Sequence, residues 1–147
     1  MEIVFNLSLP RDEASVPVVR RVCREALVML GVKRDCVSDI ELAVTEACTN
    51  VLKHVAATDE QYEVSVEVDD GNCDIRVIDM AGADFDHENR GFEEAAASAE
   101  SGRGIFIMRA MVDELKFISA PEQGSVVHLV KKLDLEDDSV LKRLQLA

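Results

Sequence analysis

The strongest constraint on the fold is that strand-like segments of this chain come in pairs joined by short turns. Apolar and polar residues alternate from 62 to 68, and a second apolar segment runs from 73 to 79. Between them lies Asp69-Asp-Gly-Asn72, a sequence typical of a hairpin turn. A second pair of strands is predicted at 114–120 and 125–133. Paired strands of this kind argue against a doubly wound parallel sheet, in which single strands alternate with helices.

Helical periodicity predicts two long helices between an N-terminal strand at 2–9 and the first hairpin. Residues 15–30 form the first helix, which Gly31 ends, and residues 35–57 form the second. A shorter helix is predicted at 104–113. The apolar stripe of the first helix is expected to consist of Val18, Val22, Ala26, Met29 and Leu30.

This order of elements predicts an α+β two-layer sandwich, in which a mixed or antiparallel sheet carries its helices on one face. The chain has 147 residues, of which 48% are hydrophobic, so we expect one domain over 1–147 with a well-developed core. Residues 80–103 are predicted to be a mobile loop with one short helix at most. Long loops of this kind are usually functional. A charged tail from 134 to 147 is expected to hold the last helix.

Charge and apolar patterning exclude several classes of function. The formal net charge of −13 repels the phosphate backbone, so direct nucleic-acid binding is not expected. No apolar run approaches the ~20 residues that span a bilayer, and the N-terminus lacks the features of a signal peptide. We therefore expect a cytoplasmic protein without a membrane partner. The spacing of the four cysteines does not resemble a zinc site, and reduced core thiols are expected.

Three polar residues, Glu46, Asn50 and His54, recur every four positions along the second long helix. They share one stripe beside the apolar face, at the boundary between core and solvent. An amide oxygen suits Mg²⁺ whose other ligands are phosphate and water, and a carboxylate one turn earlier suits a general base. An ordinary amphipathic helix with a polar flank has the same pattern, and the helix alone favours that interpretation.

A second candidate is Gly102-Arg103-Gly104, which precedes an apolar helix. Glycines allow a ligand to approach the backbone, a helix N-terminus offers N–H groups to phosphate, and Arg103 adds a charge-assisted contact. The alternative is a loop that closes onto a buried helix.

The third candidate is Asp79, which ends a buried strand and is followed by a turn of small residues containing Gly82. Its carboxylate could accept a hydrogen bond from an exocyclic amine and so select adenine, or it could cap its own turn. Ser125 follows Gly124 at the start of a strand and could reach the same base pocket, or serve the turn. Both interpretations stay open for each residue.

Taken together, Glu46-Ala-Cys-Thr-Asn50 with His54, Asp79 with its turn, and Gly102-Arg-Gly104-Ile-Phe-Ile-Met resemble the N, G1 and G2 boxes of the GHKL ATPase superfamily. Within it, the chain most resembles the small bacterial anti-sigma-factor serine kinases, from the first strand to about residue 133. The resemblance implies a Bergerat-type sandwich that binds ATP with Mg²⁺.

The resemblance also implies roles for individual residues. Glu46 would be the catalytic base, Asn50 would ligate Mg²⁺, and Asp79 would hold the adenine amine. Residues 82–103 would form the ATP lid. The other nucleotide-binding residues would be His54, Gly82, Gly102, Arg103, Gly104 and Ser125.

The implied reaction is transfer of the γ-phosphoryl group of ATP to a serine of a small anti-anti-sigma partner of the STAS type. A sigma factor would compete with the unphosphorylated partner for the kinase, which would be a homodimer.

The sequence departs from the family pattern after Asp79. The usual G1 box is Asp-x-Gly-x-Gly followed by Phe-Asp, whereas Asp79-Met-Ala-Gly-Ala-Asp84 is one residue longer before Phe85. This difference motivates an alternative, a non-catalytic ATP-binding module that acts by switching partners. Another alternative is a switch kinase that releases a stress-response activator.

Overall fold

The computed structural model describes residues 2–54, 61–69, 71–79, 99–120 and 124–146. Its nine elements are β1 (Glu2–Leu9), α1 (Ser15–Met29), α2 (Arg34–His54), β2 (Tyr62–Asp69), β3 (Asn72–Asp79), α4 (Ala99–Met111), β4 (Glu114–Ala120), β5 (Gly124–Lys132) and α5 (Val140–Leu146). No helix among the described residues combines the length and the apolar character needed to cross a membrane.

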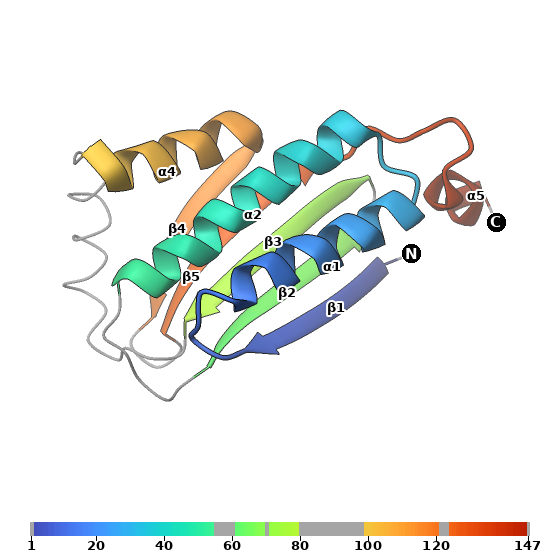
Figure 1. The fold of residues 1–147 in the computed structure, drawn as a ribbon. Helices are drawn as coiled ribbons and strands as arrows, with labels where there is room; N and C mark the ends of the chain where they lie inside the picture. The colour runs from blue at the N-terminus through green and yellow to red at the C-terminus, as the bar shows by residue number, and fades with distance from the viewer. Residues whose placement is uncertain (1, 55–60, 70, 80–98, 121–123, 147) are drawn as a thin grey trace.

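The five strands form one sheet in the order β1-β2-β3-β5-β4, and every neighbouring pair is antiparallel. The two predicted hairpins are β2–β3 and β4–β5, and β5 inserts beside β3 (Figure 1). Gly71 in the first hairpin turn has a φ of +81°, a conformation that glycine adopts without strain. The predicted sheet is therefore confirmed in its antiparallel form.

Helices α1, α2 and α4 cover one face of this sheet, with α2 in the middle (Figure 1). Alternate strand residues point towards them, and Val64, Val66, Ile75 and Val77 are almost completely buried. The residues between them, which face away from the helices, are half-buried or exposed. The sheet thus has one core face and one open face, which confirms the α+β two-layer architecture.

The apolar stripe predicted for the first helix is wrong by one position. Val19, Cys23 and Leu27 are buried, whereas Val18 and Met29 are 51% and 79% exposed. Two apolar stripes lie next to each other on α1, and both satisfy helical periodicity. Packing against α2 and the sheet selects one of them, and this selection depends on contacts that periodicity does not contain.

All four cysteines are free and buried, as expected for reduced core thiols. Burial raises the pKa of Cys23 and of Cys48 to about 12, so both thiols are protonated at neutral pH. They act as small apolar core residues rather than as nucleophiles.

The end of α1 is fixed by contacts with the C-terminal segment. Gly31 has a φ of +85°, and a Cβ built there would lie 2.6 Å from the Cα of Ser139. The Ser139 hydroxyl donates to the Leu30 carbonyl at 2.6 Å, and Glu136 N donates to the Gly31 carbonyl at 2.7 Å. Only glycine adopts this backbone conformation without strain and also leaves room for Ser139 at this distance.

We expect Gly31→Ala to lower the free energy of unfolding by more than Gly71→Ala does. Both positions have a left-handed backbone, which costs a non-glycine residue roughly 1–2 kcal/mol. Only Gly31 adds a steric overlap, since a Cβ at Gly71 would meet nothing within 4 Å. Chemical denaturation of the two variants measures the difference, and equal losses would contradict the proposed role of the Ser139 contact.

Candidate functional site

The structure brings together two segments that are about fifty residues apart in the sequence. Gly104 lies in α4 against the polar edge of α2: a Cβ at Gly104 would be 2.9 Å from Glu46 Oε2 and 3.5 Å from Asn50 Oδ1. Glycine at this position therefore leaves room for a carboxylate and an amide between two packed helices. Any larger residue would have to displace Glu46.

The amide of Asn50 has unused hydrogen-bonding capacity in a buried position. Asn50 is 3% exposed, and its Nδ2 has no hydrogen-bond partner among the described residues. A buried donor without a partner costs about 1–3 kcal/mol, so its retention calls for an explanation. An anionic ligand such as a phosphate would supply the missing acceptor, and the amide oxygen is of the type that binds Mg²⁺.

The third helix begins earlier than predicted, because α4 starts at Ala99 rather than near residue 104. Gly102, Arg103 and Gly104 thus lie within the helix and not in a turn ahead of it, and Arg103 is exposed. Ile105 and Met108 are buried, and their packing stabilises a helix that tolerates the two glycines. The backbone N–H groups that have no acceptor within the helix are therefore those of residues 99–102. They lie about one turn before the N–H groups that the sequence predicted to be free.

Asp79 and Ser125 lie opposite each other in the sheet, as partners in the β3–β5 register. Both are buried, and Asp79 is 1% exposed. From the sequence alone, it stayed open whether both residues reach one base pocket. The register shows that they are neighbours in the sheet.

Sequence reasoning missed Arg11. This residue lies two positions after the end of β1, and its Nη1 donates to Asp79 Oδ1 in a buried ion pair. Its Nη2 donates to the Val51 carbonyl of α2 at 3.3 Å. A single arginine near a strand end carries no sequence signal of such a contact, which joins residues 68 positions apart.

Other predicted residues fall partly or wholly outside the described part of the chain. His54 is the last residue of α2, and its side chain is not described. Gly82 and most of the predicted lid, up to residue 98, also lie outside the described residues, and residues 99–103 belong to α4.

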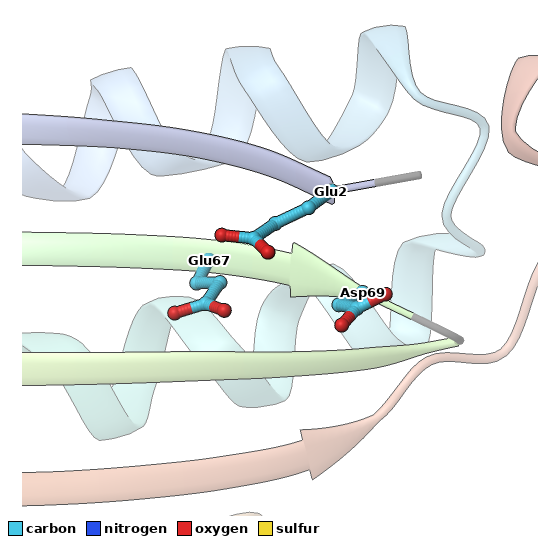
Figure 2. Close-up of side chains that lie close together, drawn as sticks. All are labelled: Glu2, Glu67 and Asp69. Atoms are coloured by element: carbon cyan, nitrogen blue, oxygen red, sulfur yellow. The ribbon is translucent and has the colours of Figure 1, made fainter.

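A separate group of carboxylates, Glu2, Glu67 and Asp69, lies at the other end of the sheet (Figure 2). Glu2 pairs with Asp69 in the β1–β2 register, whereas Asp79 pairs with Tyr62 at the opposite end of β2. The charge of Glu67 is the main cause that raises the pKa of Glu2. Mutual repulsion at an exposed strand end accounts for this shift, and the group is remote from Glu46 and Asn50.

Comparison with known proteins agrees with this geometry. The family model for the histidine kinase-like ATPase domain matches residues 9–131. The chain belongs to this family.

Two relatives of this chain are, by name, a serine-protein kinase and an anti-sigma factor. The serine-protein kinase RsbW of Bacillus velezensis is 28% identical over 141 residues, covering 90% of this chain and 87% of the relative. The anti-sigma F factor of Pasteuria penetrans is 33% identical over 102 residues, covering 65% of this chain and 68% of the relative. The resemblance to the anti-sigma-factor serine kinases is thereby confirmed.

Two solved structures share the fold. The structure of the RsbU and RsbW domains of Rv1364c from Mycobacterium tuberculosis superposes with a TM-score of 0.68 at 22% identity, over 89% of this chain and 32% of that longer chain. The SiaB–SiaC complex of Pseudomonas aeruginosa gives a TM-score of 0.67 at 11% identity, over 86% of this chain and 88% of the other.

We expect Asn50→Leu to stabilise the ligand-free protein by about 1 kcal/mol, because leucine is of similar size and removes the unsatisfied donor. The denaturant midpoint measured without nucleotide tests this. Asn6→Leu, at an exposed position of β1, is the matched control and should change stability by less than about 0.5 kcal/mol. A loss of stability in Asn50→Leu would mean that the amide has a structural partner.

Proposed function

We propose that this protein is an ATP-dependent serine/threonine-protein kinase and anti-sigma factor, which phosphorylates a small anti-anti-sigma partner and sequesters a sigma factor. The observation that carries the proposal is the meeting of Glu46, Asn50 and Gly104 in one buried corner. Phosphoryl transfer depends on positioning and on electrostatic stabilisation, and a base next to a metal-binding amide can contribute to both.

Each residue has a distinct part in this proposal. Bound Mg-ATP supplies the phosphoryl group and the cation that neutralises its charge. Asn50 offers its amide oxygen to Mg²⁺ and its buried N–H to a phosphate oxygen. Glu46, half-buried one turn earlier, accepts the proton of the attacking serine hydroxyl.

The remaining residues of the proposed site bind the nucleotide. Asp79 accepts from the adenine amine, with Ser125 beside it in the neighbouring strand. The N-terminal turn of α4 with Gly102 and the Arg103 side chain would bind the phosphates, and Gly104 leaves room for Glu46 and Asn50 beside them. His54 and Gly82 are the other proposed nucleotide-binding residues.

The proposed partners are a STAS-type anti-anti-sigma protein and a sigma factor, with the kinase acting as a cytoplasmic homodimer. The names of the relatives, serine-protein kinase RsbW and anti-sigma F factor, support this assignment. Phosphorylation of the partner would weaken its binding and leave the kinase available to hold the sigma factor. Transcription would then depend on the phosphorylation state of one serine.

We expect Glu46→Ala to bind ATP normally and to lose phosphoryl transfer by ~100-fold or more, the scale expected for removal of a positioned base. Transfer of labelled γ-phosphate to an anti-anti-sigma protein from the same organism measures it. Glu63→Ala, an exposed glutamate of β2, is the control and should transfer at the normal rate. Near-normal transfer by Glu46→Ala would reassign Glu46 to a structural role.

We expect Asn50→Ala to lose Mg²⁺-dependent ATP binding, because it removes both the proposed metal ligand and the phosphate donor. Calorimetric titration with ATP, with and without Mg²⁺, measures this effect. Thr49→Ala, whose hydroxyl is bonded within the helix to the Thr45 carbonyl, is the control and should bind normally. If the unaltered protein fails to bind millimolar ATP, a module that only binds protein partners replaces the kinase.

A further inference from the structure

Arg11 is held rigidly where it meets Asp79. A tight turn follows β1, in which Asp12 N donates to the Pro10 carbonyl at 2.8 Å and Ala14 N donates to Asp12 Oδ1 at 2.8 Å. From this turn the Arg11 side chain, 5% exposed, reaches Asp79 at the end of β3 and the Val51 carbonyl in α2. One guanidinium therefore ties the end of a strand to the central helix.

Arg11 approaches Asp79 from the side of α2 that faces α1. It lines a hollow together with Val16 and Pro17 of α1 and with Thr49, Leu52 and Lys53 of α2. The polar edge of α2 with Glu46 and Asn50 faces α4 instead. The guanidinium thus reaches the carboxylate from the α1 side of α2, whereas Glu46 and Asn50 lie on the α4 side.

We propose that Arg11 is a positioning residue for nucleobase selection: it orients the Asp79 carboxylate so that the site prefers a purine with a 6-amino group over one with a 6-oxo group. The proposal rests on the kinase function proposed above. A carboxylate has about four acceptor positions on its two oxygens, so the contact with Arg11 is compatible with one to a base amine. The contact restrains the rotation of the carboxylate.

The selectivity follows from hydrogen-bond polarity. Adenine presents an N–H donor at C6, which an ionised carboxylate accepts. Hypoxanthine presents a carbonyl oxygen at C6 instead. That oxygen and the Asp79 carboxylate are both acceptors, so no hydrogen bond forms between them. A buried site that leaves polar groups unpaired discriminates strongly, provided that the carboxylate cannot turn away.

The alternative, in which Arg11 blocks the base pocket and must leave when ATP binds, is disfavoured energetically. Its departure would leave the buried Asp79 carboxylate without its guanidinium partner, and breaking such a pair is strongly destabilising. The additional bond to Val51 raises that penalty further.

The test compares dissociation constants for ATP and inosine 5′-triphosphate, measured by calorimetry with Mg²⁺. The unaltered protein should prefer ATP by ~10-fold or more, which corresponds to about 1.4 kcal/mol. In Arg11→Met the preference should fall to within about 3-fold, and Arg11→Lys, which keeps the charge, should restore part of it. Arg24→Met is the matched control, because Arg24 forms an exposed ion pair with Glu41 and should keep the full preference.

Each other outcome overturns a specific statement. An unchanged preference in folded Arg11→Met would make Arg11 structural, and a gain in ATP affinity would make it a block. If Arg11→Met does not fold, Arg11→Lys decides, and an unchanged preference there contradicts the inference. Failure of the unaltered protein to bind ATP would overturn the proposed function as well, whereas the first three results leave that function intact.

Discussion

The burial of α2 between the sheet and two other helices is the constraint on which the rest of the structure depends. Its apolar residues, Ile40, Val44 and Val51 among them, have almost no exposed surface. An amphipathic helix packed on three sides is fixed in rotation as well as in position, because any turn about its axis would expose part of that surface. The polar edge with Glu46 and Asn50 is therefore held against α4 by core packing.

The free energy of core packing also offsets the cost of burying polar groups that do not stabilise the ligand-free fold. The amide of Asn50 has a donor without a partner among the residues that the structure describes, and the Arg11–Asp79 pair is removed from water. Buried ion pairs are often no more stable than the apolar groups that could replace them, although losing one partner costs about 3–5 kcal/mol. Both features lie where the nucleotide is proposed to bind. The chain keeps both polar features although they do not stabilise the fold, as expected for a site under selection for function.

The sequence contained the hairpins, the antiparallel sheet and the spacing of Glu46 and Asn50, because these depend on alternation, turn residues and helical period. It did not contain the choice of stripe on α1, since two adjacent stripes are equally apolar and only tertiary contacts select one. The start of α4 was misjudged because glycines permit a turn without requiring it, and burial of Ile105 and Met108 extends the helix. Arg11 was missed because its contacts with Asp79 and Val51 join distant parts of the chain.

The register of the sheet separates its two ends. The Gly71 turn, the end of α1 at Gly31 and the C-terminal segment meet at one end, where Leu133 N donates to the Gly71 carbonyl and Ser139 contacts Leu30. Asp79, Ser125 and Arg11 lie at the other, where β3 ends and β5 begins. Connections at that end could change in length or sequence during evolution while the opposite end kept the domain folded. New partner specificities could then arise in this scaffold without repacking its core.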